Sequence, residues 1–159
     1  MPIVLFRVDE RLIHGQVVIG WGNQLRPDRY LVVDDALAKS GWEQDLYRLG
    51  SGDAEAVFVA VDGAHERIVE WREAPERSIL LTRDISTMRC ISDEGVLKGE
   101  RVNLGGIHHG LGRDEVLAYL HLTEEDRSDL RAMAAAGVEI ASRDLPDSHR
   151  VTLDTLLKT

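Results

Sequence analysis

The chain has 159 residues, of which 43% are hydrophobic and 30% are charged, and it carries a formal net charge of −9. This length suits one domain with its own core, and no apolar run is long enough to cross a bilayer. The acidic balance argues against broad binding to nucleic acid, which needs lysine and arginine to displace the counterions of the phosphates.

The start of the chain and its cysteine content favour the cytoplasm. Residues 1–7 read MPIVLFR and lack the basic region, the longer apolar stretch and the cleavage site of a secretory signal. The sequence has a single cysteine, Cys90, which excludes an internal disulfide and gives no zinc pattern. We therefore expect a cytoplasmic protein with one domain over residues 1–159.

Strands and helices are expected to alternate along the first half of the chain. The short apolar runs are continuous, as in strands buried on both faces of a parallel sheet, and helical spacing lies between them. In order, we expect a strand at 3–8, a helix with His14, Val18, Trp21 and Leu25 on one face, a strand at 30–33, a helix at 42–49, a strand at 56–61, a helix at 66–73 and a strand at 79–82.

The second half continues the alternation. We expect a helix at 84–93, strands at 102–104 and 119–122, a helix at 123–136, a strand at 138–141 and a short terminal helix at 151–157. Thr123 is the expected cap of its helix, and Gly137 ends that helix. The whole pattern predicts an α/β fold with a mostly parallel central β-sheet covered by helices on both faces.

Ionisable side chains crowd the segment between the first strand and the first helix. Residues 7–17 read RVDERLIHGQV and bring together Arg7, Asp9, Glu10, Arg11 and His14. Ligands of open α/β sheets bind at the carboxyl ends of the strands, and a helix N-terminus there favours an anion. The segment is therefore the first candidate for a reactive site.

His14 is the candidate nucleophile, because a neutral imidazole can attack phosphorus. Arg11 and backbone N–H groups would then hold the oxygens of the transferred group, and Asp9 would orient the loop or fix the tautomer of the ring. We interpret Glu10 as solvated. The alternative for His14 is an ordinary surface or capping histidine, and the residues alone leave the two interpretations even.

A second notable stretch, residues 103–112, is rich in glycine and histidine and reads NLGGIHHGLG. Its spacing is neither a Walker loop nor a dinucleotide fingerprint. His108 and His109 are adjacent and point in different directions, so we expect a flexible turn with solvated histidines. A zinc site that combines His14, one of these histidines and a carboxylate is the alternative.

Other polar and aromatic residues have a structural interpretation beside a functional one. Asp34 and Asp84 follow strands and could hold magnesium, but such acids cap helices more often. Trp21 is expected in the core, whereas Trp42 and Trp71 are expected to be partly exposed and available to a partner protein.

The segment 7–17 resembles the active-site signature of the mannose/fructose/sorbose family of enzyme IIB components of the sugar phosphotransferase system (PTS). Three later stretches are similar to that family and keep its order: YLVVDD, VNLGGIH, and LTEED followed by GVEI and LPD. The resemblance covers nearly the whole chain and implies a mostly parallel sheet covered by helices. The Gly-rich stretch departs from the family by extra His and Gly residues.

The resemblance also implies an activity, that of a phosphohistidine–sugar phosphotransferase component. His14 would receive a phosphoryl group from a phosphohistidine on a IIA protein or domain and pass it to a sugar that enters through the membrane subunits IIC and IID. Arg11 would steady the phosphoryl group and Asp9 would support the loop. No metal and no diffusible cofactor are implied, and the chain would associate peripherally with the membrane subunits.

Three interpretations stay open from the sequence. The first is this phosphoryl carrier, the second is a regulatory PTS-like module that senses phosphorylation state without sugar transport, and the third is a metal-dependent hydrolase that uses His14, His108 and acidic residues. The sugar, the phosphorylated ring nitrogen and the formation of a homodimer also stay open.

Overall fold

The computed structural model of the protein describes residues 2–158. Its centre is a seven-stranded sheet with the strand order β3-β2-β4-β1-β5-β8-β9, in which β9 alone runs antiparallel. The strands are β1 (Ile3–Val8), β2 (Arg29–Val33), β3 (Glu55–Val59), β4 (Ser78–Thr82), β5 (Arg101–Leu104), β8 (Glu139–Ser142) and β9 (Val151–Thr152). The predicted α/β fold with a mostly parallel sheet is confirmed.

The predicted strands coincide with the observed ones to within two residues at each end, because these runs are buried on both faces. Val8, Leu31 and Leu80, from three neighbouring strands, are fully buried. A second, two-stranded antiparallel sheet contains β6 (Asp114–Leu117) and β7 (Leu120–Leu122). The strand expected at 119–122 therefore exists, but it pairs outside the main sheet.

The helices are η1 (Gln16–Trp21), α1 (Gly22–Leu25), α2 (Asp35–Ala38), α3 (Gly41–Leu49), α4 (Ala64–Glu73), α5 (Ile85–Ile91), η2 (Asp93–Gly95), α6 (Glu124–Ala135) and α7 (Leu153–Leu157). Helices α3 to α6 lie where amphipathic segments were expected, whereas α2 and η2 were not expected, and the terminal helix expected from 151 begins at 153 because residues 151–152 form β9. Thr123 caps α6 in a capping box with Asp126, as its sequence predicted. No helix within residues 2–158 is long and apolar enough to span a membrane.

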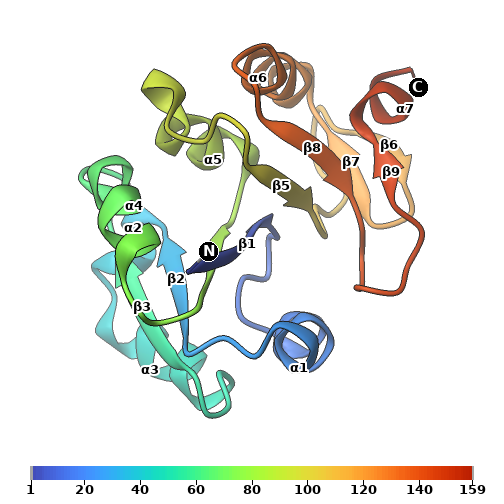
Figure 1. Ribbon diagram of the computed structural model, residues 1–159. Coiled ribbons are helices and arrows are strands. Elements are labelled where there is room, and N and C mark those ends of the chain that lie inside the picture. The colour runs from blue at the N-terminus through green and yellow to red at the C-terminus, as the bar shows by residue number, and fades with distance from the viewer. Residues whose placement is uncertain (1, 159) are drawn as a thin grey trace.

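The direction of each crossover decides which face its helix covers. The chain moves from β1 to β2 and β3 in one direction along the sheet, and it returns through β4 to β5 and β8 in the other. Right-handed crossovers place the helices of the two directions on opposite faces. Figure 1 accordingly shows α4, α5 and α6 above the sheet and α1 and α3 below it. Helices therefore cover both faces from β3 to β1.

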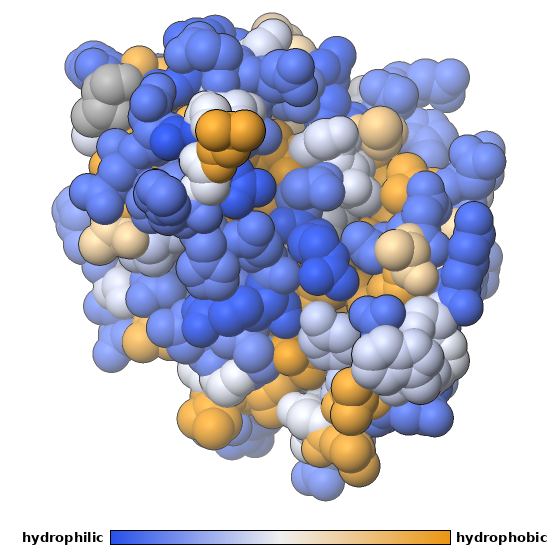
Figure 2. Space-filling model, turned by 180° about the vertical axis from the view of Figure 1, so that it is seen from behind, coloured by the Kyte–Doolittle hydropathy of each residue, from blue (hydrophilic) through white to orange (hydrophobic). Residues whose placement is uncertain are grey.

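Two core clusters fill the space on either side of the sheet. The cluster below contains Val17 of η1, Leu37 of α2 and Leu81 of β4. The cluster above is larger and contains apolar side chains of α4, α5, α6 and α7. The outer surface is mostly hydrophilic in the view of Figure 2, and hydrophobic side chains gather at its lower edge.

The first helix differs from the expected regular α-helix. Residues Gln16–Trp21 form a π-helix, which continues directly into α1. A Cβ atom on Gly20 would lie 2.7 Å from Leu145 Cδ2, so glycine lets this helix pass close to Leu145. π-Helical turns occur frequently at functional sites.

Candidate functional site

The segment 9–15 lies where the sheet topology favours a ligand. β1 is flanked by β4 and β5, and the chain leaves β1 toward β2 but later reaches β5 on the opposite side. This reversal is the switch point of the sheet, where open α/β folds bind ligands beyond the carboxyl ends of the strands. The loop that contains Asp9, Arg11 and His14 begins at this point.

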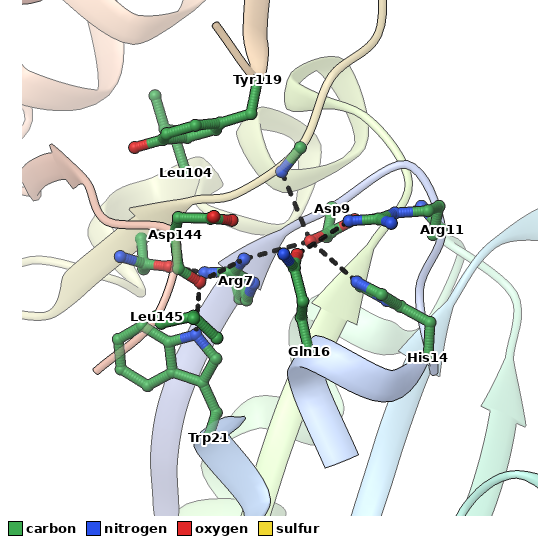
Figure 3. A network of polar contacts seen from close by, with 12 residues as sticks. Arg7, Asp9, Arg11, His14, Gln16, Trp21, Leu104, Tyr119, Asp144 and Leu145 are labelled. Carbon is green, nitrogen blue, oxygen red and sulfur yellow. Dashed lines mark hydrogen bonds and ion pairs between the residues drawn. The ribbon is translucent and has the colours of Figure 1, made fainter. Parts of the chain in front are cut away.

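Asp9 is the centre of the polar network in Figure 3, and its side chain is fully buried. Its Oδ1 accepts a hydrogen bond from the Arg11 backbone N–H at 3.1 Å, which holds the turn. Its Oδ2 accepts from Arg7 Nη2 at 3.1 Å and from the Gly106 backbone N–H at 3.3 Å. The carboxylate therefore joins the loop after β1 to the Gly-rich segment after β5.

Arg7 forms the floor of the site and is fully buried. Its guanidinium donates to the Asn103 side chain, to the Arg143 carbonyl at 2.9 Å and to the Asp144 carbonyl at 3.1 Å. Burial lowers the pKa of Arg7, and the neighbouring Asp9 carboxylate opposes that shift. Arg7 thus anchors the loop from below and is no exposed donor.

His14 turns both of its ring nitrogens toward the protein. Nδ1 lies 2.9 Å from the Leu12 carbonyl oxygen, so the tautomer with a proton on Nδ1 donates there. Nε2 is buried, lies 3.8 Å from Asp9 Oδ2 and has no hydrogen-bond partner among residues 2–158. The side chain is 14% exposed, and Figure 3 shows the ring directed at Asp9.

Leu12 brings its carbonyl to His14 in a left-handed backbone conformation. Its φ angle is +56°, and its side chain is fully buried. A branched residue in this region costs about 1–3 kcal/mol and persists where the surroundings determine it. The loop is therefore held in a strained shape next to the imidazole.

Arg11 is the exposed cation of the site. Its side chain is 44% exposed, its Nη2 donates to Gln16 Oε1 at 2.8 Å, and its Nε lies 3.9 Å from Asp9 Oδ1. The backbone N–H groups of Gly15 and Gln16 open the helix beside it and have no acceptor among residues 2–158. An anion at this position would meet a guanidinium and a helix N-terminus together.

Glu10 is not solvated, and the prediction for it is wrong. Its carboxylate accepts from the His108 backbone N–H at 2.7 Å and from Arg113 Nη1 at 3.2 Å, and it lies 3.0 Å from His108 Nδ1. Burial raises the pKa of Glu10, but the bonds from His108 and Arg113 outweigh burial and lower it. The two residues that contact the Glu10 carboxylate lie 98 and 103 positions away in sequence, so spacing gave no signal for them.

The start of the Gly-rich segment is tied to the site and is no free turn, whereas His108 and His109 are exposed, as expected. The Glu10 N–H donates to the Gly106 carbonyl at 2.8 Å, and the Gly105 N–H donates to the Val8 carbonyl at 2.8 Å. A Cβ atom on Gly105 would lie 2.6 Å from Asp9 Oδ2 and closer still to the Arg7 guanidinium. Glycine is therefore required where this segment passes the buried ion pair.

The remaining candidate residues have structural roles. Asp34 and Asp84 cap α2 and α5, as expected of such acids. Trp21 is in the core and Trp42 is 69% exposed, both as predicted, but Trp71 is fully buried, so its predicted exposure is wrong. Within the described residues no group of three or more His, Cys, Asp or Glu side chains is arranged to hold a metal ion.

The comparisons with known proteins agree on one family. The family model described as PTS system sorbose subfamily IIB component matches residues 3–159. The N-acetylgalactosamine-specific phosphotransferase enzyme IIB component 1 of Escherichia coli is 28% identical, over 93% of this chain and 94% of that protein. The mannose-specific EIIAB component of Escherichia coli is also 28% identical, over 99% of this chain but 49% of that protein.

A solved structure has the same fold over the same length. The crystal structure of manxB from Thermoanaerobacter tengcongensis superposes with a TM-score of 0.87 at 26% sequence identity. The match covers 99% of this chain and 95% of that one. The arrangement of strands and helices described above is therefore shared along the entire fold.

Proposed function

This chain belongs to the family of sorbose-type IIB components of the phosphotransferase system, and we propose that it is a phosphoryl carrier whose acceptor is His14. The observation that carries the proposal is the position of His14 and Arg11 at the switch point of the sheet, beside the open end of a helix. His14 takes the phosphoryl group from a phosphohistidine on a IIA protein or domain and passes it to a sugar.

Two displacements at phosphorus make up the transfer. In the first, a His14 ring nitrogen forms a bond to phosphorus while the bond from phosphorus to the donor histidine nitrogen breaks. In the second, a sugar hydroxyl oxygen attacks phosphorus, the bond to His14 breaks, and the hydroxyl proton leaves with a base. Arg11 and the amides of Gly15 and Gln16 stabilise the charge on the transferred oxygens throughout.

The imidazole must turn before it can react. Nδ1 is bonded to Leu12 and Nε2 is buried against Asp9, so neither nitrogen faces an incoming donor. Rotation of the ring breaks the contact with the Leu12 carbonyl and presents one nitrogen to the phosphoryl group beside Arg11. Asp9 and Arg7 stay in place as the buried support of the loop.

The partners follow from the family. The proposed donor is a IIA protein or domain, and the proposed acceptor system is the pair of membrane subunits IIC and IID with their sugar, at the cytoplasmic face of the membrane. The relatives compared above are named for N-acetylgalactosamine and for mannose at the same 28% identity. Similarity therefore gives no preference for one sugar.

The proposal is tested by transfer of labelled phosphate from a phosphorylated IIA domain. The protein should acquire acid-labile, base-stable phosphate, and His14→Ala should abolish it. His149→Ala removes an exposed histidine far along the chain and should label normally. Normal labelling of His14→Ala would show that the acceptor is another residue. Labelling without transfer to any sugar in the presence of IIC and IID would favour the regulatory interpretation.

A further inference from the structure

The sheet has a bare area on its lower face, beyond β1. The crossovers from β3 to β4, β5 and β8 all run in one direction, so α4, α5 and α6 lie together on the upper face. No helix of the described residues covers the lower face of β5 and β8. A cavity of about 610 Å³ lies there, and we call it the sheet groove.

The floor of the sheet groove comes from three neighbouring strands. Leu5, Asn103 and Ala141 line it, and the pairings Arg7 with Asn103 and Asn103 with Ala141 place these residues on one face. Trp21 and Leu25 form one wall, and Arg143 and Arg150 line the groove from the far end of the sheet. The volume is in the range of small-molecule sites, which is about 300–1,000 Å³.

The rim of the sheet groove is basic although the chain is acidic overall. Arg77, Arg101, Arg143 and Arg150 line it together with two acids, Glu100 and Glu139. This is an excess of two positive charges in a chain with a net charge of −9. The sheet groove therefore attracts an anion, although the net negative charge of the molecule repels one.

Some of these arginines are already bonded, and Arg143 has donors to spare. Arg101 Nε and Arg150 Nη2 share the Glu139 carboxylate at 3.0 and 2.6 Å. Arg77 donates to the Leu25 carbonyl. Arg143 uses Nε for the Ser148 carbonyl, and its two Nη atoms have no acceptor among residues 2–158. A guanidinium edge with two unused nitrogens matches a phosphate group.

We propose that the sheet groove binds a sugar phosphate. The free edge of Arg143 takes the phosphate, and the Glu139 carboxylate accepts a hydrogen bond from a sugar hydroxyl. Glu100 takes no part, because its side chain is 11% exposed and its carboxylate lies 4.0 Å from Arg72 of α4. Glu139 favours a hydroxylated anion over a bare one, because a carboxylate repels phosphate but accepts from a hydroxyl. Leu5 and Ala141 contact the carbon skeleton. This binding goes beyond the phosphoryl transfer proposed above and holds whether or not His14 carries phosphate.

Titration of the full-length protein with mannose 6-phosphate by calorimetry tests the inference. We expect a saturable binding heat, weakened at least about tenfold in Arg143→Gln and in the rim variant Arg150→Gln. Both substitutions keep the backbone carbonyl of residue 143 that Arg7 binds. Arg48→Gln is the matched control, since Arg48 is paired with Asp45 on exposed α3, and it should bind as the parent does.

Three results would overturn the sheet groove as the site. The first is no binding up to about 10 mM mannose 6-phosphate. The second is binding of inorganic phosphate as tight as that of the sugar phosphate. The third is loss of binding in Arg11→Gln, which would locate the ligand at the His14 loop instead. Retained binding in Arg11→Gln and in His14→Ala supports the groove and leaves the phosphoryl-carrier proposal to its own test.

Discussion

At the scale of single residues, Arg7 and Arg11 have the same residue type but very different surroundings. Arg7 is buried and both of its Nη atoms donate to protein acceptors, whereas the side chain of Arg11 is 44% exposed. The sequence predicted Arg11 and His14 as partners, and the structure brings both beside Asp9. Nothing in the sequence indicated that Arg7 is buried beneath the site, because that position depends on hydrogen bonds to the Arg143 and Asp144 carbonyls.

Arg11→Ala should slow phosphoryl transfer much more than it lowers stability. The guanidinium would act on oxygens that are present once the phosphoryl group arrives, so its loss should reduce the transfer rate by about 100-fold or more. Its single strong bond in the resting protein is to Gln16, so the unfolding free energy should change by about 0.5 kcal/mol or less. Transfer from phosphorylated IIA and urea unfolding measure the two effects. Equal losses would contradict the assigned task.

Gly105→Ala should destabilise the protein by about 1–3 kcal/mol, because the added methyl group overlaps the buried Arg7–Asp9 pair. Gly15→Ala is the control, since a Cβ atom there meets nothing within 4 Å and Gly15 already has helical backbone angles. Urea unfolding should show a lower midpoint for the first variant and an unchanged or higher one for the second. A neutral Gly105→Ala would show that the pair has room to move.

Glu10→Gln should make stability less sensitive to acid. The folded-state pKa of Glu10 lies below its ordinary value, so the ionised carboxylate stabilises the fold at neutral pH. That contribution is fully present above the ordinary pKa of about 4.5 and is lost as the pH falls through the lower, folded value. The stability difference between parent and variant should therefore shrink below pH 4.5. Thermal unfolding across pH measures it, with exposed Glu76→Gln as the control.

At the scale of elements, the strands were the predictable part. Their continuous apolar runs have one physical explanation, burial on both faces, and the structure buries them so. The π-helix of η1 could not be foreseen, because the stripe of His14, Val18, Trp21 and Leu25 suits a regular helix equally well. Strand β6 of the hairpin was missed, since Asp114 and Glu115 are polar and exposed and only two apolar residues follow them, which leaves no apolar run to detect.

Helix α3 carries an exposed apolar stripe that the fold does not use. Trp42, Leu46 and Leu49 are 69%, 57% and 85% exposed, and no residue of α3 is buried. Leu49→Gln should therefore change the unfolding free energy by about 0.5 kcal/mol or less. Leu37→Ala, in a fully buried position of α2, should lower it by about 2–5 kcal/mol. Urea unfolding of both variants checks the contrast.

At the scale of the whole molecule, the handedness of the crossovers organises the protein. It sets the switch point at β1, where the candidate site lies, and it leaves the lower face of β5 and β8 open as the sheet groove. The sequence predicted a sheet with helices on both faces but not the strand order. Without the strand order, the contacts between residues 9–14 and 105–113 could not be predicted. Nor could the uncovered lower face of β5 and β8.

The buried Arg7 also links the site to the order in which the chain is made. Its acceptors lie 96, 136 and 137 residues further along, so β1 leaves the ribosome long before they exist. Synthesis at roughly 5–20 residues per second delays the last of them by on the order of ten seconds. During that interval the arginine has no native partner beyond Asp9. A nascent chain released before residue 144 would carry His14 on a loop without its floor, so the candidate site is among the last parts of the protein to be completed.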